Sequence, residues 1–205
     1  MNFIEFRRKM FDLACFNVNQ IYAWDPGFNR NNLVRWTTNG LIIRLRQGYY
    51  TFPEYSGRPD YPLWFANRIY RPSYISLHTA LAFYGMIPEG VMQITSVTSL
   101  KTALFSNAFG EYSFKSVKSE LMFGFDLKSM ADGRTLSFAT PEKALLDLLY
   151  LYPFYDTEQD MEDLRLDEGF ISEDLNRDLL KAFTYRFENK ALEQRITRLM
   201  KIFGI

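Results

Sequence analysis

Residues 29–52 constrain the fold of this chain more than any other stretch. Their first part carries apolar side chains at helical spacing, with Leu33, Trp36 and Thr37 on one face and mostly polar residues on the other. Gly40 follows where a helix commonly ends in a left-handed residue, which glycine adopts without strain. The pattern predicts a short helix that buries one side and presents its polar side to solvent.

A two-stranded hairpin is predicted directly after this helix. Residues 41–46, LIIRLR, alternate as a strand does, so Leu41, Ile43 and Leu45 would share one face, and Ile42, Arg44 and Arg46 would share the other, outer face. Gln47-Gly48 predicts the turn, because glycine tolerates the positive φ of tight hairpin turns. The YYTF run would form the return strand, with at least one tyrosine in the hairpin core. A helix, a glycine and a basic hairpin are together typical of the recognition helix and wing of a winged helix.

Arginine and asparagine side chains on this unit are suited to reading DNA. In the major groove, arginine presents a bidentate fork to guanine, and asparagine does so to adenine. The predicted base contacts are Asn31, Asn32 and Arg35, with Thr38 and Asn39 contacting bases or backbone. The predicted phosphate contacts are Arg30, Arg44 and Arg46. The alternative is that these residues form only a solvated helix face and an ordinary hairpin.

Charge is divided unevenly along the chain, although the net charge is zero. Residues 1–72 hold ten Lys/Arg against five Asp/Glu, whereas residues 73–205 hold fourteen against nineteen. Such asymmetry predicts a small nucleic-acid-binding part joined to a more acidic partner domain. Chance clustering in a balanced protein is the alternative.

The preceding residues complete the order of elements of a winged helix-turn-helix. Residues 3–14 repeat apolar side chains at the spacing of an amphipathic helix. A second short helix would be capped by Asn17 or Asn19, and Asp25-Pro26-Gly27 predicts a turn before the third helix. We therefore expect a winged helix-turn-helix DNA-binding domain over residues 1–55.

A second domain is expected over residues 60–205, after a proline-rich linker or surface loop at 53–62. The predicted elements are helices over 63–70 and 76–85, a strand over 93–98, hairpins over 101–114 and 121–139, a nearly apolar helix from Thr140, and two amphipathic helices over 172–187 and 189–203. The fold class expected is α+β. A winged helix-turn-helix would precede a mixed α/β domain with a small, mostly antiparallel sheet and several helices.

Cysteine content and apolar runs bear on the compartment. The single cysteine, Cys15, excludes an internal disulfide and fits a reducing compartment. Charges interrupt the apolar start MNFIEFRRKM, so no export signal is expected. The chain has no run of about 18 apolar residues, so we expect no membrane span. A cytoplasmic protein is the resulting prediction.

Residues that would indicate an enzyme are few. His78 is the only histidine, and no serine or cysteine nucleophile accompanies it in a triad pattern. The phosphate-binding loops G-x-x-x-x-G-K-[ST] and G-x-G-x-x-G are both missing. We therefore expect no catalytic residues, no cofactor and no metal site.

The segment 156–178 is strongly acidic, with ten Asp/Glu and two Arg. Its densest group consists of Glu158, Asp160, Glu162, Asp163, Asp167 and Glu168. Carboxylates bind hard cations only in a defined geometry, and the spacing of an EF-hand is absent. A solvated acidic helix is the simplest interpretation. The alternatives are an acidic face that recruits a basic partner, or the metal site of a nuclease or nucleotidyltransferase.

Several motifs of the chain together resemble the AbiEi family of antitoxins from type IV toxin–antitoxin systems. The run SYISLHTALAFYGMIPEGVMQITSVT is followed by LMFGF and then by ATPEKALLDLLYLYP. Upstream, LIIRLRQGYYTF resembles the winged-helix domain at the N-terminus of that family. The likeness covers about residues 3–155, and the acidic C-terminal third carries no matching motif.

The resemblance implies a bacterial antitoxin that also represses its own operon. The winged helix would bind inverted repeats in double-stranded promoter DNA, which implies a homodimer or cooperative binding. The second domain would neutralise a nucleotidyltransferase-like toxin without forming a stable complex. A protein-interaction module that neutralises without binding DNA is the alternative function.

Overall fold

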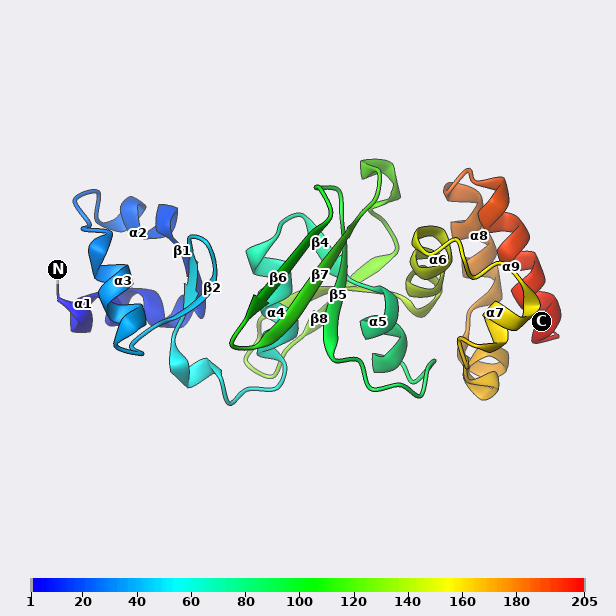
Figure 1. Cartoon of the computed structure of the whole chain (residues 1–205), viewed down its shortest axis with the longest axis horizontal. Helices are drawn as coiled ribbons and strands as arrows, with labels where there is room; N and C mark the ends of the chain where they lie inside the picture. Colours follow the sequence, from blue (N-terminus) through cyan, green and yellow to red (C-terminus); the bar gives the residue numbers. More distant parts are fainter. Residues whose placement is uncertain (1, 205) are drawn as a thin grey trace.

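The computed structural model describes residues 2–204, and it has three parts along its long axis (Figure 1). An N-terminal unit with a three-stranded sheet lies at one end, a six-stranded sheet lies in the middle, and C-terminal helices lie at the other end. This arrangement confirms the α+β class. The outermost bounds of the two predicted domains, residues 1 and 205, lie outside the described residues.

The N-terminal unit has the element order helix, strand, two helices and hairpin. Its elements are α1 (Phe3–Met10), a 3₁₀ turn (Phe11–Leu13), β1 (Cys15–Asn17), α2 (Val18–Trp24), α3 (Asn31–Thr38), β2 (Ile43–Arg46) and β3 (Tyr49–Thr51). The three strands form an antiparallel sheet in the order β1-β3-β2. Strand β1 was absent from the sequence prediction, which had placed only helices and a turn before the hairpin.

Local signals start and orient these helices. At α2, the Asn17 side chain accepts a hydrogen bond from the Gln20 backbone N–H (3.0 Å), and the Gln20 side chain accepts one from Asn17 (2.8 Å). This reciprocal capping satisfies two N–H groups that the helix itself leaves unpaired. Trp36 of α3 packs on Phe6 of α1, with ring centroids 4.6 Å apart. The aromatic contact fixes α3 on the core and leaves its other face outward.

The hairpin differs from its prediction in one respect. A β-bulge between Arg44 and Arg46 leaves Leu45 as an extra residue in β2. The buried side chains are therefore Ile42 and Leu45, whereas Leu41 is exposed. The predicted alternation was wrong for Leu41 and for Ile42, which was expected on the outer face, and the bulge prevents the two arginines from following simple strand alternation.

The central sheet has the strand order β6-β7-β5-β4-β9-β8. Its strands are β4 (Ser73–Ile75), β5 (Gln93–Thr98), β6 (Ala103–Asn107), β7 (Gly110–Ser116), β8 (Phe125–Ser129) and β9 (Thr135–Ala139), with a 3₁₀ turn at Ser119–Leu121. The β5–β7 and β4–β9 pairs are parallel, and the other three pairs are antiparallel. The sheet is therefore mixed rather than simply antiparallel.

Helices cover both sides of this sheet. After a 3₁₀ turn (Pro53–Tyr55), α4 (Tyr61–Ile69) lies on the side of the N-terminal unit, and α5 (Leu77–Phe83) and α6 (Pro141–Leu151) lie on the opposite side (Figure 1). The remaining elements are α7 (Glu158–Glu162), a π-helical turn (Phe170–Asp174), α8 (Arg177–Arg186) and α9 (Lys190–Ile202). Helix α9 is the longest of the described chain at 13 residues, so none of these helices could span a bilayer.

Helix α6 is central to the second core, as its apolar sequence predicted. Two of its few charged residues, Lys143 and Asp147, form an ion pair one turn apart and are fully buried. Tyr74 and Ser76, at β4, donate hydrogen bonds to Asp147 at 2.9 and 2.8 Å. Lys143 also donates to the Tyr74 hydroxyl (2.9 Å). The network therefore ties α6 to β4 through groups that have no contact with water.

Candidate nucleic-acid interface

Helix α3 presents a polar face of the kind that the sequence predicts. Leu33 and Trp36 are buried, and they fix which side of the helix faces outward. The exposed side chains of the helix and its C-cap are Asn31, Val34, Arg35, Thr38 and Asn39. This places four of the five predicted helix contacts in solvent, and the fifth, Asn32, is partly exposed.

Arg35 and Asn32 lie together on this face. The Arg35 Nη2 donates a hydrogen bond to Asn32 Oδ1 at 3.0 Å. The pair lies one helical turn apart, which brings the two side chains to one side of α3. No carboxylate within residues 2–204 forms an ion pair with Arg35. Its guanidinium charge is therefore available to a ligand.

Arg30 and Arg44 line a cleft of about 890 Å³ beside the hairpin. The other walls come from Gly48 and its neighbours in the N-terminal unit and from residues 104–107 of β6. Among the residues that line the cleft there is no Asp or Glu, and within the described chain neither arginine forms an ion pair. Two uncompensated positive charges in a concave surface produce a potential that attracts anions.

Arg46 also lines this cleft, but its guanidinium is engaged by the second domain. Its guanidinium lies over the rings of Phe105 (4.4 Å) and Tyr70 (4.9 Å), and its Nη1 donates to the Ile69 carbonyl at 2.6 Å. A second bond, from Asn107 Nδ2 to the Leu45 carbonyl (2.9 Å), joins the same strand to β6. We therefore remove Arg46 from the predicted phosphate contacts, because the second domain already occupies its guanidinium.

Two features of this surface were missed by sequence reasoning. Val34 is 67% exposed and lies one turn after Asn31, on the face that otherwise carries polar residues. The sequence offered a signal for Val34, because helical spacing places this apolar residue on the outer face of the predicted helix. The cleft wall from β6 had no signal in the sequence, because it depends on contacts between residues about 60 positions apart.

His78 shows no arrangement of a catalytic histidine. It is half-buried on α5, and its ring packs at a steep angle against that of Tyr152, with the ring centroids 5.7 Å apart. Burial lowers the pKa of His78 against a smaller opposing effect of Glu89, so the ring is mainly neutral at pH 7. Its position is that of a packed side chain at the rim of the core.

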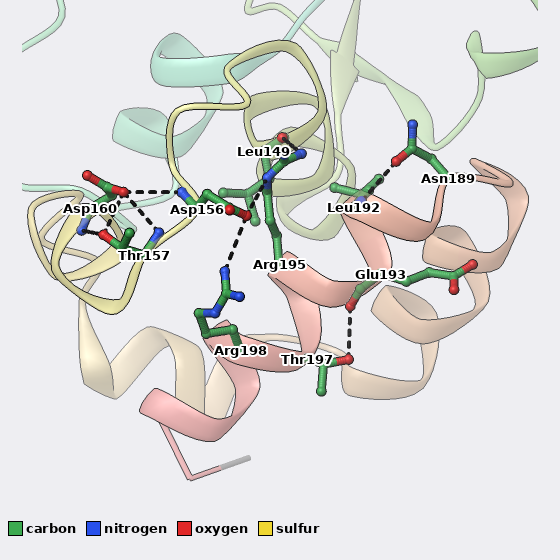
Figure 2. Close-up of polar contacts among 10 residues, drawn as sticks. All are labelled: Leu149, Asp156, Thr157, Asp160, Asn189, Leu192, Glu193, Arg195, Thr197 and Arg198. Atoms are coloured by element: carbon green, nitrogen blue, oxygen red, sulfur yellow. Dashed lines mark hydrogen bonds and ion pairs between the residues drawn. The ribbon is translucent and has the colours of Figure 1, made fainter.

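The acidic segment uses several of its carboxylates within the fold. Figure 2 shows Asp156 accepting hydrogen bonds from Arg195 and Arg198 of α9, each at 3.2 Å. Asp160 accepts from the Thr157 backbone at 2.9 Å and thereby caps α7. Across residues 2–204, no three His, Cys, Asp or Glu side chains converge as the ligands of a metal ion would. Asp156 therefore ties the turn before α7 to α9, whereas Asp160 acts only at the start of its own helix.

Comparisons with protein families and with curated proteins bear on the identity of this chain. No protein-family profile matches it. No curated protein matches it at a significant level. The likeness to AbiEi antitoxins thus depends on sequence motifs alone. The structure places the two longest of those motifs on β4–α5–β5 and on α6, where the buried network of Lys143 and Asp147 connects them.

Proposed function

We propose that this protein binds double-stranded promoter DNA through α3 and the β2–β3 hairpin, as a winged-helix repressor of AbiEi type. The order of its N-terminal elements and the sheet order β1-β3-β2 support a winged helix. The observation that carries the proposal is a set of three arginines, with Arg30 at the N-cap of α3, Arg35 on α3, and Arg44 in the same cleft as Arg30. Arg30, Arg35 and Arg44 are all exposed, and within residues 2–204 none has an acidic partner.

The proposed mechanism assigns a separate role to each part of this surface. Helix α3 enters the major groove, where Arg35 reads guanine and Asn31 or Asn32 reads adenine. Val34 contacts a thymine methyl group, the apolar group that a base pair presents in the major groove. The Asn32–Arg35 hydrogen bond holds the guanidinium over the helix before binding, so less side-chain freedom is lost on the DNA.

Phosphate contacts would fix the position of α3 on the duplex. Arg30 and Arg44 neutralise phosphates at the cleft beside the hairpin, and Thr38 and Asn39 at the end of α3 reach the backbone or the adjacent bases. Two copies of the chain on inverted repeats would place their α3 helices about 34–36 Å apart. Repression of its own promoter follows if that site overlaps the start of transcription.

The antitoxin half of the proposal concerns the second domain. It is supported by the motifs that resemble AbiEi proteins, which the fold brings together around α6. The domain would counteract a nucleotidyltransferase-like toxin without holding it in a stable complex. Co-expression tests this half, because growth arrest caused by a toxin encoded next to this gene should be relieved by residues 60–205 as well as by the full chain.

A direct test uses fluorescence anisotropy with duplex DNA from immediately upstream of the gene. The shuffled duplex of the same composition is the control. The proposal predicts at least about tenfold tighter binding of the upstream duplex, the order of discrimination that one bidentate base contact provides. Equal affinity for the two duplexes, or no binding at 50 mM salt, would leave only a protein-interaction function.

A further inference from the structure

A second cavity, of about 620 Å³, lies between the end of α4 and the β8–β9 hairpin. Its volume is within the range of sites for small molecules. Its polar wall is lined by Asn67, Arg68, Arg71 and Ser73, and the apolar residues that line it are Met122, Phe125 and Leu127 with Pro72. None of the lining residues is acidic.

The polar wall contains donors that have no acceptor within the described chain. They are Asn67 Nδ2, Arg68 Nε and Ser73 Oγ, and all three atoms are buried. Asn67 is only 6% exposed, and its Oδ1 accepts a hydrogen bond from the Ser137 backbone N–H at 2.6 Å. That bond fixes the orientation of the Asn67 side-chain amide, whose NH₂ group has no hydrogen-bond acceptor among the described residues. Buried donors without an acceptor are costly. These three atoms have almost no accessible surface, so the groups of this wall that can meet a ligand are the guanidinium ends of the arginines.

Both arginines of this wall lack a carboxylate partner within residues 2–204. Arg68 is held by stacking on Trp64, with its Cζ 4.6 Å from the ring centroid. Arg71 is held by the bond from its Nε to the Asn67 carbonyl (2.9 Å). Two guanidinium groups without carboxylate partners match the several acceptor oxygens of a phosphate.

We propose that this cavity binds a small phosphorylated molecule with a flat apolar ring, the chemistry of a nucleoside monophosphate. The phosphate lies against Arg68 and Arg71, and the ring lies on Phe125 and Leu127. Phe125 is itself stacked on Tyr74 (4.6 Å), which makes this part of the cavity rigid. The proposal does not depend on DNA binding, because none of these residues belongs to the surface around α3.

The same two arginines face a smaller cavity of about 330 Å³ where the two units meet. That cavity is lined by Cys15, Asn17 and Tyr49 of the three-stranded sheet. Arg68 and Arg71 therefore line both cavities, and a phosphate bound to them would lie close to the junction of the two units.

Isothermal titration calorimetry of the full chain with the four ribonucleoside 5′-monophosphates tests the proposal, with inorganic phosphate as a further probe. At least one nucleotide should bind with a Kd below about 1 mM, and inorganic phosphate should bind at least about tenfold more weakly. R71Q and L127E should each weaken nucleotide binding by at least about tenfold, because they remove a phosphate ligand or place a negative charge in the cavity.

M92E is the matched control, since Met92 is 94% exposed and lies outside the cavity, and it should bind as the wild type does. Leu127 is 68% exposed, so L127E is expected to fold, and circular dichroism verifies this. Absence of binding by all four nucleotides would overturn the proposal. Binding that R71Q and L127E leave unchanged, or equal affinity for inorganic phosphate, would overturn it too.

Discussion

The Nη1 of Arg46 donates a hydrogen bond to the backbone carbonyl of Ile69, across 2.6 Å and 23 positions of sequence. Arg46 belongs to the hairpin of the N-terminal unit, and Ile69 ends the first helix of the second domain. The bond and the two aromatic rings around the guanidinium attach the hairpin to the larger domain. These contacts therefore fix the orientation of the hairpin, and of the N-terminal unit that carries α3, relative to the second domain.

Replacement of Arg46 should reduce stability more than replacement of its neighbour Arg44. R46A removes a charge-assisted hydrogen bond and the stacking on Tyr70 and Phe105, at a cost of about 1.5–3 kcal/mol. R44A removes an exposed side chain without an ion pair and should change the free energy of unfolding by less than about 0.5 kcal/mol. Urea denaturation of both variants measures the difference. Equal losses would contradict the assignment of Arg46 to the junction.

Val34 should matter for DNA and not for folding. V34E places a carboxylate on the face of α3 that meets the groove, where it is repelled by phosphates, so affinity should fall by at least about tenfold. The side chain is largely exposed, so the free energy of unfolding should move by less than about 0.5 kcal/mol. Y185E, at a 72% exposed position of α8, is the control. Identical DNA affinity of V34E and Y185E would exclude this face of α3.

The sequence identified the elements whose signals are local. Leu33 and Trp36 gave the buried side of α3, the strand over 93–98 is β5 with the same bounds, and Thr140 caps α6 as predicted. In each case the signal, either the spacing of apolar residues or a capping side chain, lies within one element. The prediction therefore did not depend on contacts between distant parts of the chain.

Features that depend on distant partners were not predictable. Strand β1 has three residues between two helices, too few to show a strand period, and it exists because β3 pairs with it. The bulge at Leu45 breaks an otherwise regular alternation in β2. The prediction of the phosphate contacts had the same weakness. In the sequence Arg46 is equivalent to Arg44, and only the contact with the distant Phe105 distinguishes the two arginines.

Cys15 should be almost unreactive in the folded protein. Burial raises the pKa of its thiol to about 12, against a smaller opposing effect of Arg71. At pH 8 the reactive thiolate is therefore far rarer than in the unfolded chain, and labelling by a disulfide reagent should be slower on the order of 10³-fold. Labelling with and without urea measures the ratio. Rapid labelling of the native chain would contradict the burial of the Cys15 thiol.

Loss of Lys143 should leave a buried charge on Asp147. K143M is expected to lower the free energy of unfolding by about 3–5 kcal/mol, the usual cost of breaking a buried ion pair. K118M, from the exposed pair with Glu120, is the control and should cost less than about 1 kcal/mol. Urea denaturation at pH 7 distinguishes them, and similar values for both variants would contradict the burial of the pair.

The pH dependence of K143M follows from the direction of one shift. Burial raises the pKa of Asp147, and Lys143 opposes this effect, so K143M raises that pKa further. A folded state with the higher carboxyl pKa binds the proton more tightly than the unfolded state and loses stability as pH rises above the unfolded value of about 3.9. The deficit of K143M should therefore be smaller at pH 5.5 than at pH 8. A deficit that grows on acidification would contradict this account.

The salt dependence of binding to the upstream duplex tests the central claim most directly. Each phosphate contact contributes about −0.9 to the slope of log K against log salt concentration. We predict that R30Q/R44Q reduces the magnitude of the wild-type slope by about 2, whereas R165Q, at a remote exposed arginine, leaves it unchanged. An unchanged slope and affinity in R30Q/R44Q would contradict DNA binding by this surface.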